Sequence, residues 1–431
     1  MNYQPTLAFA QQLDREDPLA AYREQFHFPQ HNGNDVYYFT GNSLGLMPKS
    51  VRDYLDTELD SWACCGVEGH FEGPHPWMHY HKLFSEKAAR LVGALPEEVV
   101  VMNTLTVNLH LAMVSFYRPQ GKRTKIVMEG GAFPSDQYAV ESQVKFHGLD
   151  PETHIIELIP RPGEQNLRTE DILAVLQKHA DEIALVMLGA VNYYTGQWFE
   201  MEKITQAGHA LGAVVGFDLA HAAGNVPMQL HDWGVDFAVW CSYKYLNSGP
   251  GGPSGLFVHQ KHGNNADLPR FAGWWGHRED ERFQMKKGFQ PMSGAAGWQL
   301  SNAQVFASAP HLASLALFDE VGMARLREKS LKLTGYLEFL LGELLREQPE
   351  CGLVILTPSD PMQRGCQLSL FARKNGRKLF DYLSAHGVIA DWREPDVIRV
   401  APVPMYNRFE DVYQFVALLK SGVQQFEGLT V

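Results

Sequence analysis

Cysteine is scarce in this 431-residue chain, and its pattern argues against two kinds of site. There are five cysteines, an odd number, and none of them shows C-x-x-C spacing. This favours reduced intracellular thiols over a disulfide framework or a structural zinc site. The cysteines are Cys64, Cys65, Cys241, Cys351 and Cys366.

Positively charged residues are also few, which excludes some classes of binding partner. The chain has 37 lysines and arginines against 49 aspartates and glutamates, a formal net charge of −12 at pH 7. Nucleic acids and anionic membrane surfaces are bound through basic faces, so we expect neither as a partner. The expected partner is a small-molecule substrate.

Long hydrophobic runs and metal-binding spacings are missing too. No apolar stretch approaches the roughly 18 residues of a membrane-spanning helix, and the N-terminus lacks the basic and apolar regions of a signal peptide. We therefore expect no membrane span and a cytoplasmic location. The histidine-rich segment around His70, His75, His79 and His81 contains no H-E-x-x-H pattern, so we expect no metal site.

What the sequence does contain is a regular alternation of apolar and amphipathic segments. Its 45% hydrophobic and 20% charged residues are typical of a globular protein with room for two domains. Short apolar runs separated by helical patterning predict an α/β fold, with a mostly parallel sheet and helices on both faces. The runs are 99–102, 125–128, 155–158, 183–188, 213–218, 236–241 and 255–258, and helical segments between them include 136–147, 169–180 and 200–210.

From about Pro310 the pattern indicates a smaller α+β domain. Leucines at three- and four-residue spacing between 333 and 344 predict a long helix. Strands near 353–356, 366–371 and 397–400 and helices near 376–386 and 408–426 are expected to follow. The expected division is an N-terminal helical segment over 1–40 packing on the main domains, a large domain over 41–310 and a small C-terminal domain over 311–431.

Lys244 and Asp218 follow two of the predicted strands. Asp218 closes the apolar run AVVGFD, and Lys244 comes after FAVWC and before the turn GPGG. Ligands of such sheets bind at the carboxyl ends of the strands, so we expect both side chains in one pocket. A desolvated lysine amine is a nucleophile, and an aspartate can keep a pyridine nitrogen protonated. Together they are the pair that a pyridoxal 5′-phosphate enzyme needs.

Ordered motifs along the chain resemble the kynureninase family, which consists of fold-type I pyridoxal phosphate enzymes in the class V aminotransferase group. The resemblance covers about residues 37–426. It implies a fold-type I architecture, pyridoxal 5′-phosphate as cofactor and a homodimer with the active site at the subunit interface. The motifs are GNSLGL (41–46), TLTVNLH (104–110), AFPSD (132–136), YTGQ (194–197), GFDLAHAAGN (216–225), CSYKYLN (241–247), GWWGH (273–277) and IRVAPVP (398–404).

The resemblance also implies roles for individual residues. The expected catalytic residues are Lys244, which binds the cofactor covalently, Asp218, which holds the pyridine nitrogen, and Tyr243, which contacts the phosphate and relays a proton. Phe133 is implied to stack on the cofactor ring. The implied cofactor-binding residues are Leu105, Thr106, Phe133, Pro134, Ser135, Asp136, Asp218, His221, Tyr243, Lys244, Trp274 and Asn302.

Ordinary structural roles remain open for several of these residues. Thr106 could be a plain helix N-cap, Phe133 a core side chain and His221 a buried hydrogen-bonded histidine. One position departs from the family pattern, because Gly189 stands where some members have a serine ahead of YTGQ. That difference puts one polar cofactor contact in doubt.

For the substrate, the resemblance implies that Arg399 binds an α-carboxylate through its planar fork. A surface ion pair is the alternative for Arg399. A histidine matching His70 and a Ser-Asn pair matching Ser301 and Asn302 accompany a preference for 3-hydroxykynurenine in the family, so we expect that preference here. The implied substrate-binding residues are Arg399, His70, Ser43, Ser301 and Asn302.

The activity implied by the resemblance is hydrolytic cleavage of the Cβ–Cγ bond of L-kynurenine or 3-hydroxy-L-kynurenine. The products are L-alanine and anthranilate or 3-hydroxyanthranilate, in tryptophan catabolism and with a further expected link to NAD biosynthesis. A class V cysteine desulfurase or aminotransferase would share Asp218, His221 and Lys244. A desulfurase needs a cysteine in a mobile loop, whereas Cys351 and Cys366 adjoin apolar runs. A non-catalytic binding protein of the same fold is the other alternative.

Overall fold

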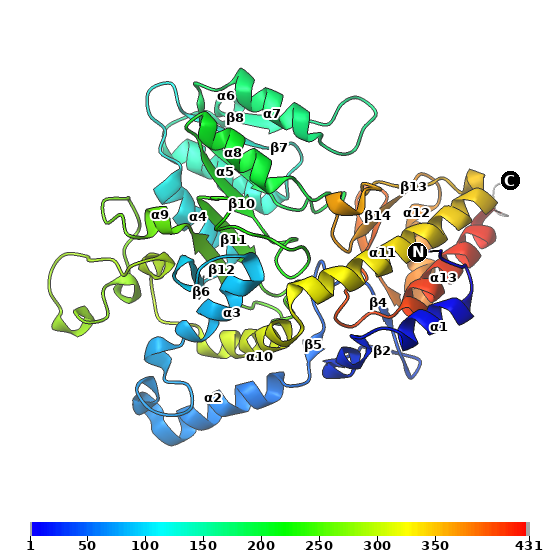
Figure 1. Ribbon diagram of the computed structural model, residues 1–431, viewed down its shortest axis with the longest axis horizontal. Helices are drawn as coiled ribbons and strands as arrows, with labels where there is room; N and C mark the ends of the chain where they lie inside the picture. Colours follow the sequence, from blue (N-terminus) through cyan, green and yellow to red (C-terminus); the bar gives the residue numbers. More distant parts are fainter. Residues whose placement is uncertain (1, 428–431) are drawn as a thin grey trace.

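The apolar runs of the first two thirds of the chain form one seven-stranded sheet in the computed structural model, which describes residues 2–427 (Figure 1). The strands are β6 (Val99–Met102), β7 (Lys125–Glu129), β8 (Ile155–Leu158), β9 (Ile183–Gly189), β10 (Val214–Asp218), β11 (Phe237–Cys241) and β12 (Ser254–Val258). Their order is β6-β12-β11-β10-β9-β7-β8, and β12 runs in the opposite direction to the other strands of this sheet. The predicted α/β fold with a mostly parallel sheet is confirmed.

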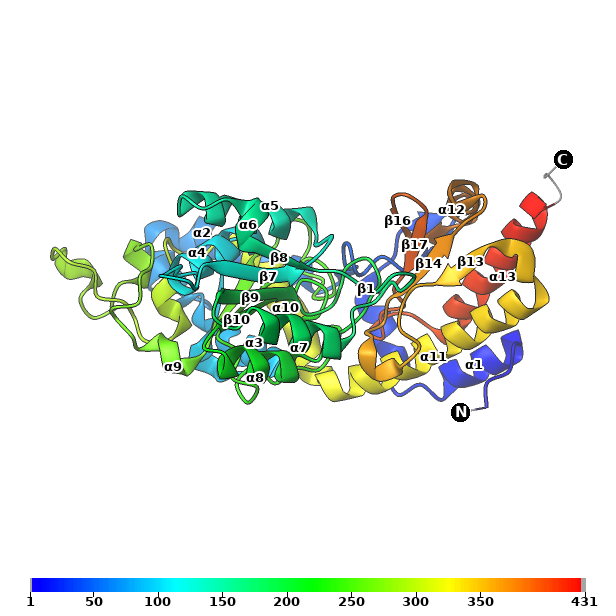
Figure 2. The same ribbon diagram turned by 90° about the horizontal axis from the view of Figure 1, so that it is seen from above.

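Helices cover both faces of this sheet because alternate strand residues point in opposite directions. In β6, Val100 and Met102 pack in a cluster with one set of helices, whereas Val99 and Val101 pack in a second cluster on the other face. Figure 2 shows the two layers, with the sheet between them. The first cluster includes α4 (Leu105–Phe116) and α5 (Pro134–Phe146), and the second includes α3 (Lys82–Val92), α7 (Thr169–Lys178), α8 (Met201–Ala210) and α10 (Val305–Val321).

The remaining helices of this part of the molecule are α2 (Val51–Cys65), which packs along α10, and the short α6 (Pro151–His154) and α9 (Gln260–Gly263). No helix within residues 2–427 has both the length and the apolar character needed to cross a membrane.

A second, four-stranded antiparallel sheet forms the core of the smaller unit. Its order is β13 (Leu353–Ile355), β14 (Leu368–Ala372), β17 (Val397–Val400) and β16 (Asp391–Arg393). Apolar side chains of this sheet pack against leucines of the long helix expected around 333–344. The helices of this unit are α11 (Met323–Glu347), α12 (Gly376–Ala385) and α13 (Phe409–Glu427).

The expected domain boundary at residue 310 lies inside α10. Leu312, Leu315 and Phe318 of that helix pack in the core of the large sheet, and so does Leu326 at the start of α11. Leu333 is the first residue of α11 that packs in the core of the smaller unit. We therefore propose that the small domain begins within α11, because a continuous helix carries the chain from one core to the other.

The N-terminal segment contributes one α-helix and several short strands. α1 (Leu7–Arg15) packs on α13, and β4 (Tyr37–Tyr38) pairs in parallel with β15 (Val388–Ile389). The other short strands form β1 (Phe26–His27) with β5 (Met47–Pro48), and the hairpin β2 (Gln30–His31) with β3 (Asn34–Asp35).

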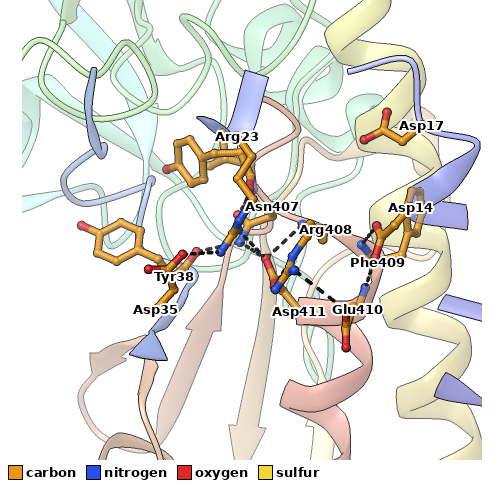
Figure 3. Close-up of polar contacts among 12 residues, drawn as sticks. Asp14, Asp17, Arg23, Asp35, Tyr38, Asn407, Arg408, Phe409, Glu410 and Asp411 are labelled. Carbon is orange, nitrogen blue, oxygen red and sulfur yellow. Dashed lines mark hydrogen bonds and ion pairs between the residues drawn. The ribbon is translucent and has the colours of Figure 1, made fainter. Parts of the chain in front are cut away.

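Polar contacts fasten this N-terminal segment to the start of α13 (Figure 3). The carboxylate of Asp14 accepts hydrogen bonds from the backbone N–H groups of Phe409 and Glu410, at 2.7 and 3.0 Å. It thus satisfies donors that the first turn of a helix leaves free. The buried carboxylate of Asp411 pairs with Arg23 at 3.1 Å. Charged groups as well as packing thereby join the N-terminal segment to the start of α13.

Candidate active site

The ends of β10 and β11 bring Asp218 and Lys244 to the same edge of the large sheet. Asp218 is the last residue of β10, and Lys244 follows the last residue of its parallel neighbour β11, as expected. Both side chains line one cavity. The cavity is lined by Glu129, Phe133, Asp136, Gly189, Val191, Tyr193, Asp218, Ala220, His221 and Lys244.

Lys244 is held by a histidine that belongs to the same cavity. Its Nζ lies 3.0 Å from Nε2 of His221 and 5.7 Å from the centroid of the Phe133 ring. Burial, reinforced by the positive charge of Lys244, keeps the pKa of His221 well below its usual range. A neutral His221 can accept a hydrogen bond from the ammonium group. Its Nδ1 is buried and has no hydrogen-bond partner among the described residues.

Three carboxyl groups face Lys244, the one ammonium group among the described residues that line this cavity. Burial raises the pKa of Asp218, while Lys244 opposes that rise, and burial together with the charge of Asp218 raises the pKa of Asp136 well above its usual range. Burial also raises the pKa of Glu129 to about 7. One Oδ atom of Asp218 accepts a hydrogen bond from the Ala220 N–H at 2.6 Å. The cavity therefore has more acidic groups than its own cation can balance.

Two helices begin beside each other near the cavity. α4 begins at Leu105, directly after β6, and α5 begins at Pro134. In their first turns, Thr106 Oγ1 and Ser135 Oγ lie 2.8 Å apart. Free backbone N–H groups and hydroxyls at helix N-termini are suited to a phosphate group. The expected helix start at Leu105 and Thr106 is confirmed, and Thr104 rather than Thr106 occupies the N-cap position.

The aromatic wall of the cavity consists of Phe133 and Tyr193. The ring of Phe133 is 40% exposed and meets the Tyr193 ring edge to face, with centroids 5.3 Å apart. Tyr193 is not among the residues proposed from sequence. Gly189 also lines this cavity, and a Cβ atom at that position would lie 2.8 Å from a carboxylate oxygen of Glu129.

Arg399 is fully buried behind the wall rather than in the cavity lining. Its Nη1 donates to the carbonyl of Tyr193 at 2.6 Å, and its Nη2 bonds the carboxylate of Asp391 on the neighbouring strand β16. Nε has no partner among the described residues. The expected alternative of a surface ion pair is wrong in one respect, because this ion pair is buried.

Tyr243 precedes the lysine but does not line the cavity. Its carbonyl accepts a hydrogen bond from the Gly45 N–H at 2.9 Å, which ties the GNSLGL motif to the lysine loop. Burial and the neighbouring Cys241 raise the pKa of the Tyr243 phenol. The phenol therefore keeps its proton at neutral pH.

Apart from Arg399, Tyr243 and the helix-start residues Leu105, Thr106, Pro134 and Ser135, five proposed residues do not line the cavity of this single chain. Trp274 is 46% exposed and donates through Nε1 to the Arg282 carbonyl at 3.1 Å. It belongs to the segment between α9 and α10, which projects from the large domain away from the small one (Figures 1 and 2). The others, which also do not line the cavity, are His70, Ser43, Ser301 and Asn302.

Glu129 was the functional candidate that sequence reasoning missed alongside Tyr193. A signal for it exists, because Glu129 is a charged residue ending an apolar strand, as Asp218 is. The predicted strand 125–128 stops one residue short of it.

The residues present fit a flat cationic ring that carries a phosphate. The surplus of buried carboxyls accommodates a positive charge, and Phe133 offers an aromatic face. The unpartnered Nδ1 of His221 and Oδ1 of Asp136 are buried polar atoms that a bound group could satisfy. The hydroxyls of Thr106 and Ser135, which meet at the N-termini of α4 and α5, suit the phosphate.

Comparison with known proteins supplies the family. The profile of the kynureninase C-terminal domain matches residues 326–419. The kynureninase of Flavobacterium psychrophilum is 57% identical over 423 residues, which cover 98% of this chain and 99% of that protein. The chain belongs to the kynureninase family. The kynureninase of Myxococcus xanthus is also 57% identical, over 98% of this chain and 99% of its own length.

A solved structure extends the likeness to the fold. The apo cysteine desulfurase of Thermococcus onnurineus is 19% identical and superposes with a TM-score of 0.72 over 90% of this chain and 95% of that one. This similarity concerns the fold alone and confirms the expected fold type. Membership of the kynureninase family confirms the expected enzyme class, and pyridoxal 5′-phosphate is the cofactor.

Proposed function

We propose that this enzyme cleaves kynurenine-type substrates hydrolytically at the Cβ–Cγ bond, releasing L-alanine and an anthranilate-type acid. The observation that carries this proposal is the meeting of Lys244, Asp218 and His221 in one cavity, in a chain 57% identical to a named kynureninase. Tryptophan catabolism is the context that this reaction fits, and we extend the proposal to a supply of precursor for NAD biosynthesis.

The bound cofactor supplies an aldehyde for condensation with amines and a ring that withdraws electrons from the substrate carbon. The chain's part begins with Lys244, whose Nζ is placed at the cavity and is the amine proposed to hold the cofactor. Asp218, in its ionised form, would hold a proton on the ring nitrogen through its negative charge. Phe133 would offer its aromatic face to the ring and exclude water from it.

Proton movement falls to two side chains of the lysine loop. Lys244 Nζ is proposed to remove the α-proton once its amine is free, and the neutral His221, 3.0 Å away, can accept its hydrogen bond at that stage. Tyr243 is proposed to donate a proton to the carbon left by bond cleavage, because its phenol keeps its proton. Lys244 is the alternative donor for this step.

Arg399 is proposed to bind the substrate α-carboxylate. Its buried guanidinium is held by Asp391 of the small sheet and by the Tyr193 carbonyl of the cavity wall, and these two contacts fix its orientation. The unpartnered Nε is one donor that remains. Since Tyr193 lines the cavity, binding at Arg399 would act directly on the cavity wall.

A homodimer would complete the site. Trp274, Asn302, Ser301 and His70, proposed to bind cofactor or substrate, lie outside the cavity of their own chain. The segment that carries Trp274 also exposes Phe283 at 55% and Met285 at 71%. Exposed apolar groups of this size commonly mark contact surfaces. We propose that these residues reach the cavity of a second copy of the chain.

The preferred substrate is proposed to be 3-hydroxykynurenine, on the family pattern at His70, Ser301 and Asn302. A site built to hydrogen-bond the hydroxyl disfavours the analogue that lacks it, because its polar groups are left unpaired. The free cysteines and acidic charge support our proposal that the enzyme works in the cytoplasm.

Product analysis of the loaded wild-type enzyme tests the function. We expect alanine and an anthranilate-type acid in equal amounts from either substrate, and kcat/KM at least about tenfold higher for 3-hydroxykynurenine, a difference of about 1.4 kcal/mol. Sulfide release from cysteine without kynurenine cleavage would contradict the proposed function. A preference for plain kynurenine would contradict only the substrate proposal.

A further inference from the structure

Glu129 is a buried acid in the cofactor cavity to which no role has been given above. It ends β7, is 5% exposed and lines the cavity together with Asp218 and Lys244. Both of its carboxylate oxygens accept from the Gly189 N–H, at 3.2 and 3.0 Å. Gly189 ends β9, the strand between β7 and β10. The carboxyl group of Glu129 therefore reaches across to the next strand at the edge where the cavity lies.

This contact fixes the start of the cavity wall. Gly189 pairs in register with Asp218, and the Ala190 N–H donates to the Asp218 carbonyl at 2.8 Å. The chain then continues through Val191 to Tyr193, both of which line the cavity. Glu129, Gly189 and Asp218 thus form a row across three neighbouring strands.

The charged groups around Glu129 come from three further elements. Asp218 at the end of β10 and Asp136 on α5 are like-charged neighbours, whereas Lys244 in the loop after β11 is the cation of the cavity. His221 is buried and neutral. One ammonium group cannot balance three ionised carboxylates at this depth, so some of them must keep their protons.

We propose that Glu129 is a positioning residue of the cofactor site, which anchors the Gly189 amide beside Asp218 and, when ionised, adds a second negative charge to the one that Asp218 supplies. This inference rests on the proposed function, because it takes Asp218 as the partner of the ring nitrogen. Glu129 acts through Gly189 and Asp218 and not by contact with the substrate.

The charge of Glu129 follows from its surroundings. Burial and the neighbouring Asp218 raise the pKa of Glu129 to about 7. Below that pH the group is neutral, and above it the cavity gains a second negative charge. A ring that carries a positive charge is then held more strongly. The affinity of the wild type for the cofactor should therefore increase with pH, and a neutral side chain at this position cannot reproduce that increase.

The experiment compares the wild type with Glu129→Gln, which keeps the shape and an oxygen acceptor but cannot ionise. Glu157→Gln is the matched control, because Glu157 is an exposed glutamate on the neighbouring strand β8, opposite Met128 of β7. The dissociation constant of pyridoxal 5′-phosphate is measured with each apoprotein at about pH 6 and about pH 8.5. Thermal unfolding of each apoprotein is followed over the same range.

For Glu129→Gln we expect a dissociation constant within about twofold of the wild type at the lower pH and about tenfold weaker at the higher pH. Glu157→Gln should follow the wild type at both. In the apoprotein the sign is opposite: a carboxyl whose folded pKa is raised loses stability as the pH rises from about 4.5 to about 7. The melting temperature of Glu129→Gln should therefore rise relative to the wild type with increasing pH.

A second variant keeps the test decisive should Glu129→Gln fold poorly. Gly189→Ala places a Cβ 2.8 Å from a Glu129 oxygen, so the flexible carboxyl must move while its charge is retained. We expect it to weaken cofactor binding at both pH values. Equal weakening of Glu129→Gln at both pH values, or none at either, would overturn the proposal. A wild type that binds no cofactor at Lys244 would instead refute the proposed function.

Discussion

The two ends of the large sheet treat buried carboxylates in opposite ways. At the amino ends of the strands, Asp236 precedes β11 and is 3% exposed, much as Asp218 is at the carboxyl end of β10. Burial alone would raise the pKa of Asp236. Hydrogen bonds from His209 and His262, both at 2.8 Å, and from Lys261 outweigh burial and hold that pKa well below its usual range.

Glu98 shows the same arrangement at the amino end. Its fully buried carboxylate accepts from the Leu95 and Gln260 N–H groups, at 2.9 and 2.8 Å, and pairs with His231 at 2.9 Å. Asp218 and Glu129 at the other end are as deeply buried but have far fewer partners, and their pKa values are raised. Burial is therefore not what separates a structural carboxylate from a site carboxylate. The difference lies in whether the protein supplies the partners itself.

The largest expected effect comes from replacing the lysines at the two ends of the large sheet. Lys244→Ala should abolish turnover, with kcat falling more than about a hundredfold, or 2.7 kcal/mol, because no other amine of the residues that the structure describes lines the cavity. Lys261→Ala, which removes a partner of Asp236, should lower stability and leave kcat close to wild type. Steady-state assays on both variants check this, and residual activity of Lys244→Ala above a hundredth would refute the assignment.

The aspartates should separate activity from stability. Asp218→Ala is expected to lower kcat by orders of magnitude with little change in the free energy of unfolding, since its burial is uncompensated. Asp236→Ala should cost about 2–3 kcal/mol of unfolding free energy, somewhat less than for a fully buried pair because its partners are partly exposed. Denaturant titration and assay of both variants decide it. The contrast fails if Asp236→Ala is as inactive as Asp218→Ala and just as stable.

A smaller effect is expected at Arg399, which joins the cavity wall to the small domain. Arg399→Lys should raise KM about tenfold or more, with a lesser change in kcat, because one ammonium cannot reproduce two parallel hydrogen bonds. Initial rates over a range of substrate concentrations give both constants. An unchanged KM would move the carboxylate site elsewhere.

The smallest expected effect is a difference in how stability depends on pH between variants at the two ends of the large sheet. Because the folded pKa of Asp236 is depressed, its contribution to stability is present above its unfolded pKa of about 3.8 and is lost as the pH falls below it. The difference in melting temperature between wild type and Asp236→Asn should therefore begin to narrow as the pH falls below about 3.8. The gap expected for Glu129→Gln changes in the neutral range instead. If neither variant's difference in melting temperature from the wild type changed with pH in its expected range, the distinction between the two ends of the sheet would be lost.

The site residues at strand ends were the ones best predicted from sequence. Asp218 and Lys244 follow apolar runs whose predicted limits agree with β10 and β11 within one residue. Glu129 follows the same rule, but an end placed one residue early left it out. For Tyr193, position depends on Arg399, 206 residues away in sequence, and no local pattern reports such a contact.

The residues of the projecting segment show a different limit. Trp274 and Asn302 could be named by family likeness, but likeness does not say in which copy of the chain a side chain acts. The domain boundary could not be located from sequence for a similar reason. The leucine spacing of α11 predicts a helix, yet which core each turn joins depends on packing, so Leu326 and Leu333 fall on different sides.

The cap that Asp14 gives to α13 also sets an order in time. The Phe409 N–H that it accepts from lies 395 residues further along the chain. At roughly 5–20 residues per second, a ribosome needs about 20–80 s to make that stretch. Throughout this interval Ala10 and Leu13 of α1 lack the core of α13 side chains in which they are later buried. A segment of nine residues is too short to hold a helix by itself in water, so α1 gains its lasting form only when the last helix emerges to cover it.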